Sequence, residues 1–321
     1  MKVSLVITAL NEEKTIDELL GSIAIQTLKP DGVIIVDGGS TDQTVEKLLR
    51  RNFKDINLRV LIKLGANRSQ GRNKGIEKAK NEIVAITDCG CILAENWLEE
   101  ITRPFENPNV EVVAGYYFAK ADTFFQKYVT LYFCVLPKEI YEKSKKRGYE
   151  FLPSSRSFAF RKRVWKESDG YPEEMNFCED LVFNQKIKDC GYHFYFAPKA
   201  VVYWPQRKTI KSVFRQFFNY ATGDGQVFFS RYQTHSRRIS LIFFRYFLFS
   251  CFLVLTFKQS FPWFLPFFSF VLYLLWVIKK NFYYIYKLEA FLWLPILQII
   301  SDIAIMAGTI KGISKNLWED C

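Results

Sequence analysis

This chain of 321 residues has few histidines and no closely spaced cysteine pairs of the kind that bind zinc. It has only two histidines, His193 and His235, and none of its seven cysteines forms a Cys-x-x-Cys pair. Cys89 and Cys91 are two positions apart, too close for an ordinary disulfide or a zinc knuckle. A Ser-His-Asp set and the Gly-x-Gly-x-x-Gly turn are also missing, which counts against a hydrolase of that type and a dinucleotide-dependent dehydrogenase.

Internal repeats and low-complexity tracts are lacking as well. A strand-like apolar run begins at Val3, which predicts that no signal peptide precedes the fold. We therefore expect reduced thiols that serve mostly as packing residues.

The chain is rich in apolar residues and in cations. Its composition is 49% apolar and 17% aromatic, which excludes a disordered protein, and its formal net charge is +11. Cations lead directly into the first long apolar run, as in a cytoplasmic juxtamembrane segment. They are Arg207, Lys208, Lys211, Arg215, Arg231, Arg237 and Arg238. No zinc-finger spacing or RNA-binding aromatic signature accompanies them, so we expect a membrane partner and no nucleic acid.

Short apolar runs alternate with helical patterns in the first part of the chain. The expected strands are 3–8, 33–36, 58–62 and 83–87, followed by less regular strands at 110–117, 157–160, 192–196 and 200–203. This alternation predicts an α/β fold with a mostly parallel, Rossmann-like sheet flanked by helices. Ligands of such sheets bind beyond the carboxyl ends of the strands. We assign residues 1–230 to this domain and expect an amphipathic interfacial helix at about 209–229.

Residues 231–321 are predicted to form a membrane anchor. Three hydrophobic stretches, 239–257, 261–278 and 290–309, are each close to the ~20 residues that span a bilayer. A buried helical hairpin of a soluble protein is the alternative. Lys279, Lys280 and Lys287 lie between the second and third stretches, whereas only Lys258 lies between the first and second. The positive-inside rule then predicts a multi-pass protein with its N-terminal domain in the cytoplasm.

Polar turns follow two of the expected strands. Asp37 ends one strand and precedes Gly38 and Gly39. Its carboxylate can accept hydrogen bonds from a uracil or guanine ring, while the glycines allow close approach of the backbone. Asp88 ends another strand, where a carboxylate can hold a divalent ion on a diphosphate. In both cases the alternative is a residue that only shapes a turn.

Two further pairs of charged residues lie near predicted helix starts. Arg68 and Arg72 precede and enter the helix before the Asp88 strand and can reach phosphates, with a solvated face as the alternative. Glu179 and Asp180 are adjacent carboxylates. Either can cap a helix, or act as a general base that removes a proton from an acceptor hydroxyl.

Taken together and in this order, these motifs resemble glycosyltransferase family 2. The similar segments are 6–13, 36–44, 71–76, 87–90 and the pair 179–180, and the resemblance covers about residues 1–225. It implies a GT-A fold, a nucleotide-diphosphate-sugar donor, a divalent cation (Mg²⁺ or Mn²⁺) and inversion at the anomeric carbon.

Site roles follow from the same resemblance. It implies that Ala9, Glu12 and Asp37 line the nucleotide pocket and that Asp88 lies at the phosphates and the metal. It also implies that Asp180 is the base, with Glu179 beside it.

Two more arginines match less specific parts of the family pattern. Arg156, in the segment 153–160, is a candidate for contact with the diphosphate or an anionic acceptor. Arg215 falls where membrane-bound relatives carry an interfacial helix that closes on the donor, and an exposed cation of an amphipathic helix is the alternative.

Gly90 departs from the pattern. The family's metal motif usually has a second aspartate at this position. Either Asp88 holds the ion together with waters, phosphates and another side chain, or the dependence on metal is weak.

The expected reaction is sugar transfer from a UDP- or GDP-sugar to a lipid-linked or glycan acceptor at the cytoplasmic face of a membrane, as in cell envelope glycan biosynthesis. A polyprenyl-phosphate sugar synthase is one variant within this class. A processive polysaccharide synthase is another, but it normally has more membrane helices. A catalytically inactive, nucleotide-binding membrane scaffold is the alternative from another class.

Overall fold

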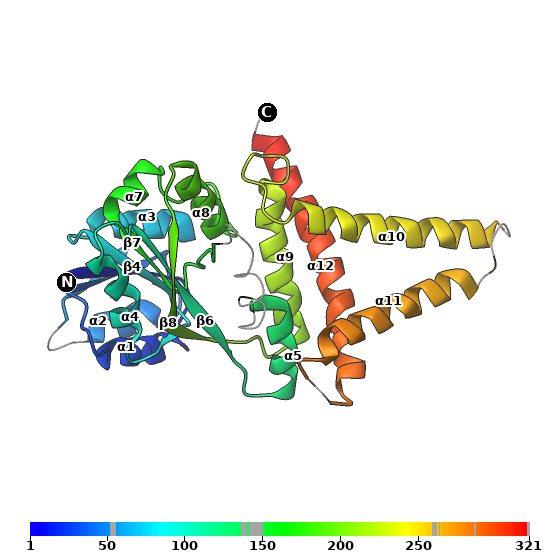
Figure 1. The fold of residues 1–321 in the computed structure, drawn as a ribbon, viewed down its shortest axis with the longest axis horizontal. Coiled ribbons are helices and arrows are strands. Elements are labelled where there is room, and N and C mark those ends of the chain that lie inside the picture. Colours follow the sequence, from blue (N-terminus) through cyan, green and yellow to red (C-terminus); the bar gives the residue numbers. More distant parts are fainter. Residues whose placement is uncertain are drawn as a thin grey trace. The chain divides into compact units, whose positions relative to one another are not determined.

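The fold consists of two compact units (Figure 1). The computed structural model describes residues 1–51, 56–135, 140, 150–258, 262, 264–285 and 287–319. The first unit comprises Met1–Lys120 and Cys134–Pro205, and the second comprises Ala121–Phe133 and Gln206–Cys321. By packing, the segment after residue 205 therefore groups with the C-terminal helices, whereas the sequence assigned residues up to 230 to the first domain.

An eight-stranded sheet forms the centre of the first unit, in the order β3-β2-β1-β4-β7-β6-β8-β5. The strands are β1 (Val3–Ala9), β2 (Gly32–Asp37), β3 (Leu58–Ile62), β4 (Ile83–Asp88), β5 (Ile92–Leu93), β6 (Val112–Lys120), β7 (Phe158–Arg161) and β8 (Phe194–Pro205). The first four are parallel, β7 runs antiparallel to β4 and β6, and β8 is parallel to β6. The predicted α/β fold with a mostly parallel sheet is confirmed.

The sequence divided β8 into two strands, and the structure shows why. Phe196 pairs with Ala114 and Val201 with Tyr116, so the four residues between them form a bulge within one strand. Such extra residues interrupt the apolar alternation on which the prediction relied. The two-residue strand β5, which pairs antiparallel with β8, is too short to give any periodic signal.

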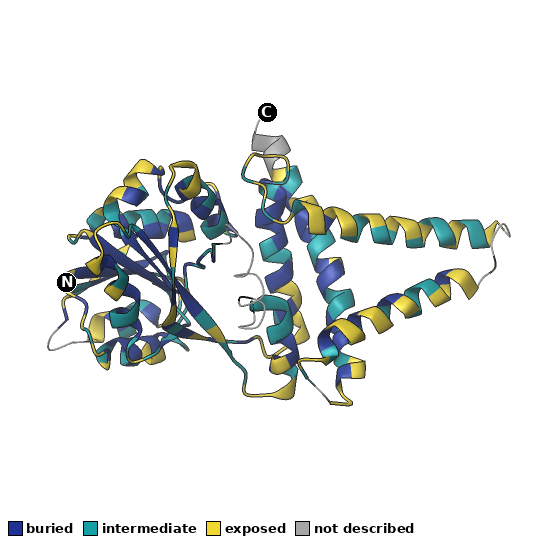
Figure 2. Cartoon of the chain, in the orientation of Figure 1, coloured by how far each residue is buried: buried dark blue, intermediate teal, exposed yellow. Residues whose placement is uncertain are grey.

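Helices cover the sheet of the first unit on both faces (Figure 1). They are α1 (Ile16–Ala24), α2 (Thr44–Arg50), α3 (Arg68–Lys78), α4 (Trp97–Thr102), α7 (Lys162–Glu167), α8 (Glu179–Asp189) and the short 3₁₀ helix η1 (Arg103–Glu106). Ile76 of α3, Val164 of α7 and Phe183 of α8 join side chains of the strands in one buried cluster. Figure 2 shows this buried layer between exposed helix faces.

Two glycines bring α3 unusually close to the sheet. A β-carbon at Gly71 would lie 2.8 Å from Thr8 Cγ2, and one at Gly75 would lie 2.4 Å from Val6 Cγ1. Only glycine fits such an approach. The contact presses the first turns of α3 against the carboxyl end of β1, and Arg72 lies between these two glycines.

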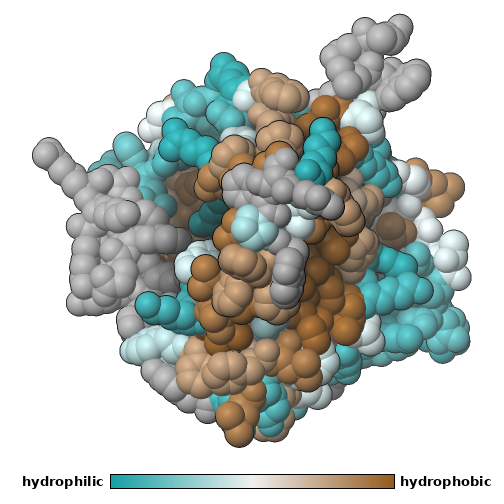
Figure 3. Space-filling view, turned by 90° about the vertical axis from the view of Figure 1, so that its right-hand side faces the viewer, coloured by the Kyte–Doolittle hydropathy of each residue, from teal (hydrophilic) through white to brown (hydrophobic). Residues whose placement is uncertain are grey.

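The second unit is helical. It contains α5 (Phe124–Phe133), α9 (Ile210–Gln226), α10 (Ser236–Phe257), α11 (Phe264–Phe282) and α12 (Ala290–Glu319). The last three are long and apolar enough to cross a membrane. Figure 3 faces the free ends of α10 and α11 and shows mostly hydrophobic side chains there. Phe261, the expected start of the second stretch, lies outside the described residues, and α12 continues ten residues past its expected end at residue 309.

A buried polar cluster ties α10, α11 and α12 together. Asp302 is fully buried, and its Oδ2 lies 2.7 Å from Arg245 Nη2 and accepts a 2.6 Å hydrogen bond from Tyr273. Gln298 donates to its other oxygen at 2.9 Å. Because an unpaired charge among apolar helices is costly, these partners fix how the three helices meet.

Candidate active site

The carboxyl ends of β2, β1 and β4 lie side by side. Ala9 at the end of β1 pairs with Asp37 of β2, and Thr8 pairs with Asp88 of β4. The structure therefore brings Ala9, Asp37 and Asp88 to one edge of the sheet, as the sequence predicted. This is the edge at which parallel sheets bind ligands.

Asp37 is buried and organises its own turn. Its Oδ1 accepts hydrogen bonds from the backbone N–H groups of Gly39 (2.8 Å) and Ser40 (2.7 Å), and its Oδ2 accepts one from Ser40 Oγ (2.6 Å). A carboxylate has about four acceptor positions, so one remains for a ligand. Asp37 therefore does shape its turn, which was the alternative to a ligand-binding role.

Glu12 is held by the same turn. Its backbone N–H donates to Thr44 Oγ1 at 2.7 Å, and the backbone N–H of Asn11 donates to Ser40 Oγ at 2.8 Å. Asn11 has a positive φ of 55° and its side-chain oxygen accepts from the N–H of Thr41 at 2.9 Å. These bonds lock the loop after β1 onto the loop after β2, so Glu12 and Asp37 have fixed relative positions.

Arg72 links two of the predicted acidic residues. Its side chain is almost completely buried, with Nη2 2.6 Å from Asp88 Oδ1 and Nη1 2.5 Å from Glu179 Oε1. Its Nε is buried and has no hydrogen-bond partner among the described residues. One guanidinium therefore joins the end of β4 to the start of α8, although 107 positions separate Arg72 from Glu179.

The two carboxylates respond oppositely to this environment. Burial acts to raise the pKa of Asp88, but the charges of Arg72, Arg156 and Arg68 outweigh burial and hold it below its usual value. Burial raises the pKa of Glu179, and only part of that rise is offset by Arg72. Burial acts to lower the pKa of Arg72, but the charges of Asp88 and Glu179 outweigh burial and raise it above its usual value.

Asp180 follows Glu179 in the first turn of α8 and is less buried than its neighbour. Its Oδ2 lies 3.4 Å from the backbone N of Ser155, and its Oδ1 accepts from the N–H of Leu181 at 3.0 Å. Acidic side chains are favoured at a helix N-terminus by the exposed N–H groups there. Asp180 therefore presents a partly accessible carboxylate next to Glu179, which is paired with Arg72.

Arg68 and Arg156 add positive charge around Asp88. The Arg68 side chain is exposed at the start of α3 and donates to the carbonyl of Asn176 at 3.0 Å. The guanidinium of Arg156 lies 3.9 Å from the ring centroid of Trp204 and donates to Ser154 Oγ at 2.7 Å. Such aromatic stacking holds a guanidinium in one orientation.

The turn after Asp88 has a second carboxylate beside it. Gly90 has a φ of 89°, which disfavours any residue with a side chain, and a β-carbon there would lie 3.6 Å from Glu12 Oε2. No group of three or more His, Cys, Asp or Glu side chains suited to a metal occurs in the described part of the chain. Mg²⁺ is commonly held by one or two carboxylates together with substrate phosphates. Asp88 and Glu12 fit that kind of site.

Arg215 lies in the other compact unit. It is exposed on α9, four positions from Lys211 on the same helix. Its expected role at the donor stays a prediction.

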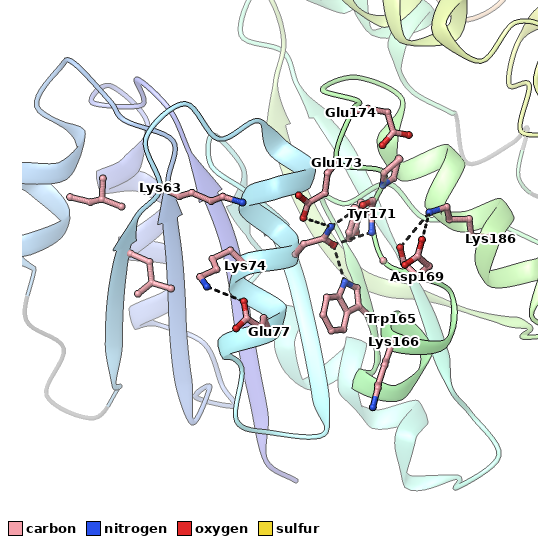
Figure 4. A pocket seen from close by; sticks show the side chains of 15 residues that line it. Lys63, Lys74, Glu77, Trp165, Lys166, Asp169, Tyr171, Glu173, Glu174 and Lys186 are labelled. Carbon is pink, nitrogen blue, oxygen red and sulfur yellow. Dashed lines mark hydrogen bonds and ion pairs between the residues drawn. The ribbon is translucent and has the colours of Figure 1, made fainter. Parts of the chain in front are cut away.

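A cavity of about 890 Å³ lies between β3, α3 and the segment that joins α7 to α8 (Figure 4). None of the predicted site residues lines it. Several of its charged side chains pair with one another, including Lys74 with Glu77 and Lys186 with Asp169. We therefore assign no ligand to it.

Sequence reasoning missed Tyr171, which lies beside Ser155 of the expected segment 153–160. Tyr171 is buried, its ring centroid lies 5.2 Å from the Arg72 guanidinium carbon, and its hydroxyl lies 3.0 Å from Ser155 Oγ. Ser155 in turn faces Asp180 through its backbone N. A lone tyrosine in a loop belongs to no sequence motif, so its contacts with Arg72 and Ser155 could not be predicted.

Comparison with known proteins identifies the class. Residues 4–168 match the model of "Glycosyl transferase family 2", and the chain belongs to this family. It is a glycosyltransferase with a GT-A fold. It is 26% identical over 225 residues to the O-antigen chain rhamnosyltransferase RfbN of Salmonella typhimurium, which covers 68% of this chain and 71% of that protein.

Solved structures share the fold. The mannosyltransferase PcManGT from Pyrobaculum calidifontis, in complex with GDP-Man and Mn²⁺, superposes with a TM-score of 0.60 at 18% identity and covers 100% of this chain and 88% of that chain. TarS of S. aureus, residues 1–349 in complex with UDP-GlcNAc, gives a TM-score of 0.51 at 21% identity over 70% of this chain and 66% of that chain.

Proposed function

We propose that this glycosyltransferase moves a sugar, with inversion at the anomeric carbon, from a UDP- or GDP-sugar to a lipid-linked or glycan acceptor at the cytoplasmic face of a membrane. The main support is the Arg72 bridge, because it brings the carboxyl end of β4 next to the acidic start of α8. A direct displacement needs a base on one side of the anomeric carbon and a stabilised leaving group on the other.

In the proposed reaction, Asp180 removes the proton of an acceptor hydroxyl. The acceptor oxygen bonds to the anomeric carbon as the bond from that carbon to the diphosphate breaks, and the nucleoside diphosphate leaves. Glu179 is tied to Arg72 and has a raised pKa, so we assign it a positioning role beside Asp180.

The nucleotide end of the donor is assigned to the edge formed by Ala9, Glu12 and Asp37. Arg68 and Arg156 are assigned to the diphosphate, because each adds positive charge near Asp88. Arg72 is engaged by two carboxylates and is assigned to hold them rather than to bind phosphate. Arg215 is proposed to approach the donor from the interfacial helix.

A divalent cation, Mg²⁺ or Mn²⁺, is proposed to bind at Asp88 and to neutralise the leaving diphosphate. Glu12 supplies the second carboxylate in this proposal, because its side chain lies next to the position where Gly90 carries none.

The C-terminal part contains helices that are long and apolar enough to cross a membrane, and this supports a lipid-linked acceptor. A polyprenyl phosphate is one such acceptor, and a growing cell-envelope glycan is another. The lack of an aspartate at position 90 favours a second candidate, a nucleotide-binding scaffold without turnover.

A panel of donors separates these two candidates. The full-length protein, purified in detergent, is incubated with individual UDP- and GDP-sugars, a polyprenyl phosphate or glycan acceptor and Mg²⁺ or Mn²⁺. Release of UDP or GDP from one donor supports the proposal. Nucleotide binding without turnover of any donor supports the scaffold.

A further inference from the structure

Helices α9 and α12 touch along their backbones. A β-carbon at Gly308 would lie 2.3 Å from the carbonyl oxygen of Phe218, and one at Gly312 would lie 2.1 Å from that of Thr222. A β-carbon at Gly225 would lie 2.5 Å from the carbonyl oxygen of Thr309. Both helices therefore run in the same direction, and small residues allow their close pairing. Two helices joined in this way must lie at a similar depth in or on a membrane.

Helix α9 is too polar to lie within a bilayer. Lys211 and Arg215 are exposed on it, and Gln216 and Asp224 are also part of it. Ile210 and Phe214 are exposed as well, so the helix is amphipathic. This composition suits the interface between headgroups and acyl chains.

The pairing register shows what would happen if α12 crossed the membrane. Phe218 lies beside Gly308 and Thr222 beside Gly312, so the same register places Lys211 near Ser301. Ser301 is close to the middle of the apolar run 290–309. A spanning α12 would therefore carry Lys211 and Arg215 into the hydrocarbon, where unpaired charges are strongly disfavoured.

The other two apolar helices, α10 and α11, both extend away from the α9–α12 pair toward the same side (Figure 1). Within the second unit, α10 and α11 project crosswise to α12 and in the same direction (Figure 1). Large apolar side chains are exposed along both of them, and Figure 3 shows this surface from the free ends of the helices. They include Leu241, Phe244, Phe247, Leu253, Phe267, Phe268 and Leu272.

The cations support the same arrangement. Arg237 and Arg238 lie at the start of α10, and Lys279 and Lys280 lie at the end of α11. Lys311 lies near the end of α12. If α12 crossed the bilayer, Lys311 would lie on the face opposite to the other four. If α12 stays on one face, all five lie there, as the positive-inside rule favours.

We propose that α9 and α12 lie together along one membrane surface and that only the α10–α11 hairpin enters the bilayer. The sequence alone predicted three crossings, with α12 as the third. In the proposed arrangement, Met1 and Lys315 are on the same side of the membrane. This inference concerns the membrane and does not rest on the proposed reaction.

Protease protection of two epitope tags on one protein tests the inference. One tag precedes Met1 and the other follows Cys321, and the full chain is expressed in cells from which sealed membrane vesicles are prepared. We expect both tags to be digested together or protected together, and detergent to expose both. One digested tag and one protected tag would overturn the proposal, because that pattern requires an odd number of crossings.

Cysteine labelling tests the depth of α9 independently. In Lys211→Cys, a membrane-impermeant maleimide is expected to add label beyond the level of the parent protein, from the side on which the N-terminal tag is accessible. A matched Leu241→Cys variant, on the exposed face of α10, is expected to gain no label in intact vesicles. Shielding of both cysteines would show that α9 lies within the bilayer and would contradict the inference.

Discussion

Arg72 Nη2 lies 2.6 Å from Asp88 Oδ1, so a buried cation of α3 holds the carboxylate at the end of β4. The same guanidinium binds Glu179, and the candidate site depends on this three-residue link. Gly71 and Gly75 explain why Arg72 reaches that position, since they let α3 lie directly against β1.

Arg72→Met should destabilise the protein by about 3–5 kcal/mol, because it leaves the buried Glu179 carboxylate without its cation. Thermal unfolding of the purified protein in detergent measures this loss. Arg50→Met is the matched control, because Arg50 and its partner Glu46 are both exposed on α2, and its melting temperature should stay close to that of the wild type. Equal melting temperatures for Arg72→Met and the wild type would contradict the assigned role.

Asp180→Asn should lower the rate of transfer by roughly 10²–10⁴-fold, because an amide cannot accept the acceptor's proton. Nucleotide affinity should be unchanged, since Asp180 is not assigned to the nucleotide. Asp169→Asn, at an almost fully exposed side chain, is the matched control and should keep full activity. Full transfer activity in Asp180→Asn would remove Asp180 as the base.

The effect of Asp88→Asn on stability should depend on pH. The pKa of Asp88 is lowered in the folded state, so its ionised form stabilises the fold at any pH above the ordinary value of 3.8. As the pH falls below 3.8 and through the lower folded pKa, this contribution disappears. The difference in melting temperature between wild type and Asp88→Asn should therefore be largest near neutral pH and shrink below 3.8. A difference that is constant with pH would contradict the ion pair.

Glu12→Gln should weaken the binding of Mn²⁺ by at least ~10-fold in the presence of saturating UDP or GDP, because removal of a direct ligand should cost no less than removal of an outer-sphere partner. Electron paramagnetic resonance of free Mn²⁺ measures the binding without any need for turnover. Glu13→Gln is the matched control at the neighbouring position. If Glu12→Gln and the wild type bind Mn²⁺ equally, another group stands in for the carboxylate missing at Gly90.

Gly312→Ala should lower the melting temperature, because its β-carbon would lie 2.1 Å from the Thr222 carbonyl oxygen and would force α9 away from α12. Gly21→Ala in α1 is the matched control, since a β-carbon there meets nothing within 4 Å, and alanine is the better helix former. If the two variants melt alike, the close α9–α12 pairing is wrong.

Periodicity was sufficient to predict the strands that build the site. Runs such as Val3–Ala9 and Ile83–Asp88 are buried almost throughout, so their apolar character is continuous and easily recognised. Because parallel strands end at one edge, the proximity of Asp37 and Asp88 also followed from the sequence. The length of β8 did not, because a bulge breaks its alternation.

Contacts between distant segments could not be predicted from the sequence. Arg72 was expected at the phosphates, but its partner Glu179 is 107 positions away, and charge alone does not reveal a buried pair. Hydropathy ended the last helix at residue 309, yet the helix continues through Gly312 because α9 packs against it there. Both differences have the same cause, since tertiary partners stabilise what local composition does not predict.

The most direct test is a structure of the full-length protein with UDP or GDP and Mn²⁺ bound. The account predicts the base of the nucleotide beside Asp37, the diphosphate and the ion beside Asp88 and Glu12, and open space for a sugar between them and Asp180. A nucleotide bound elsewhere, for example in the cavity lined by Lys63 and Trp165, would contradict it.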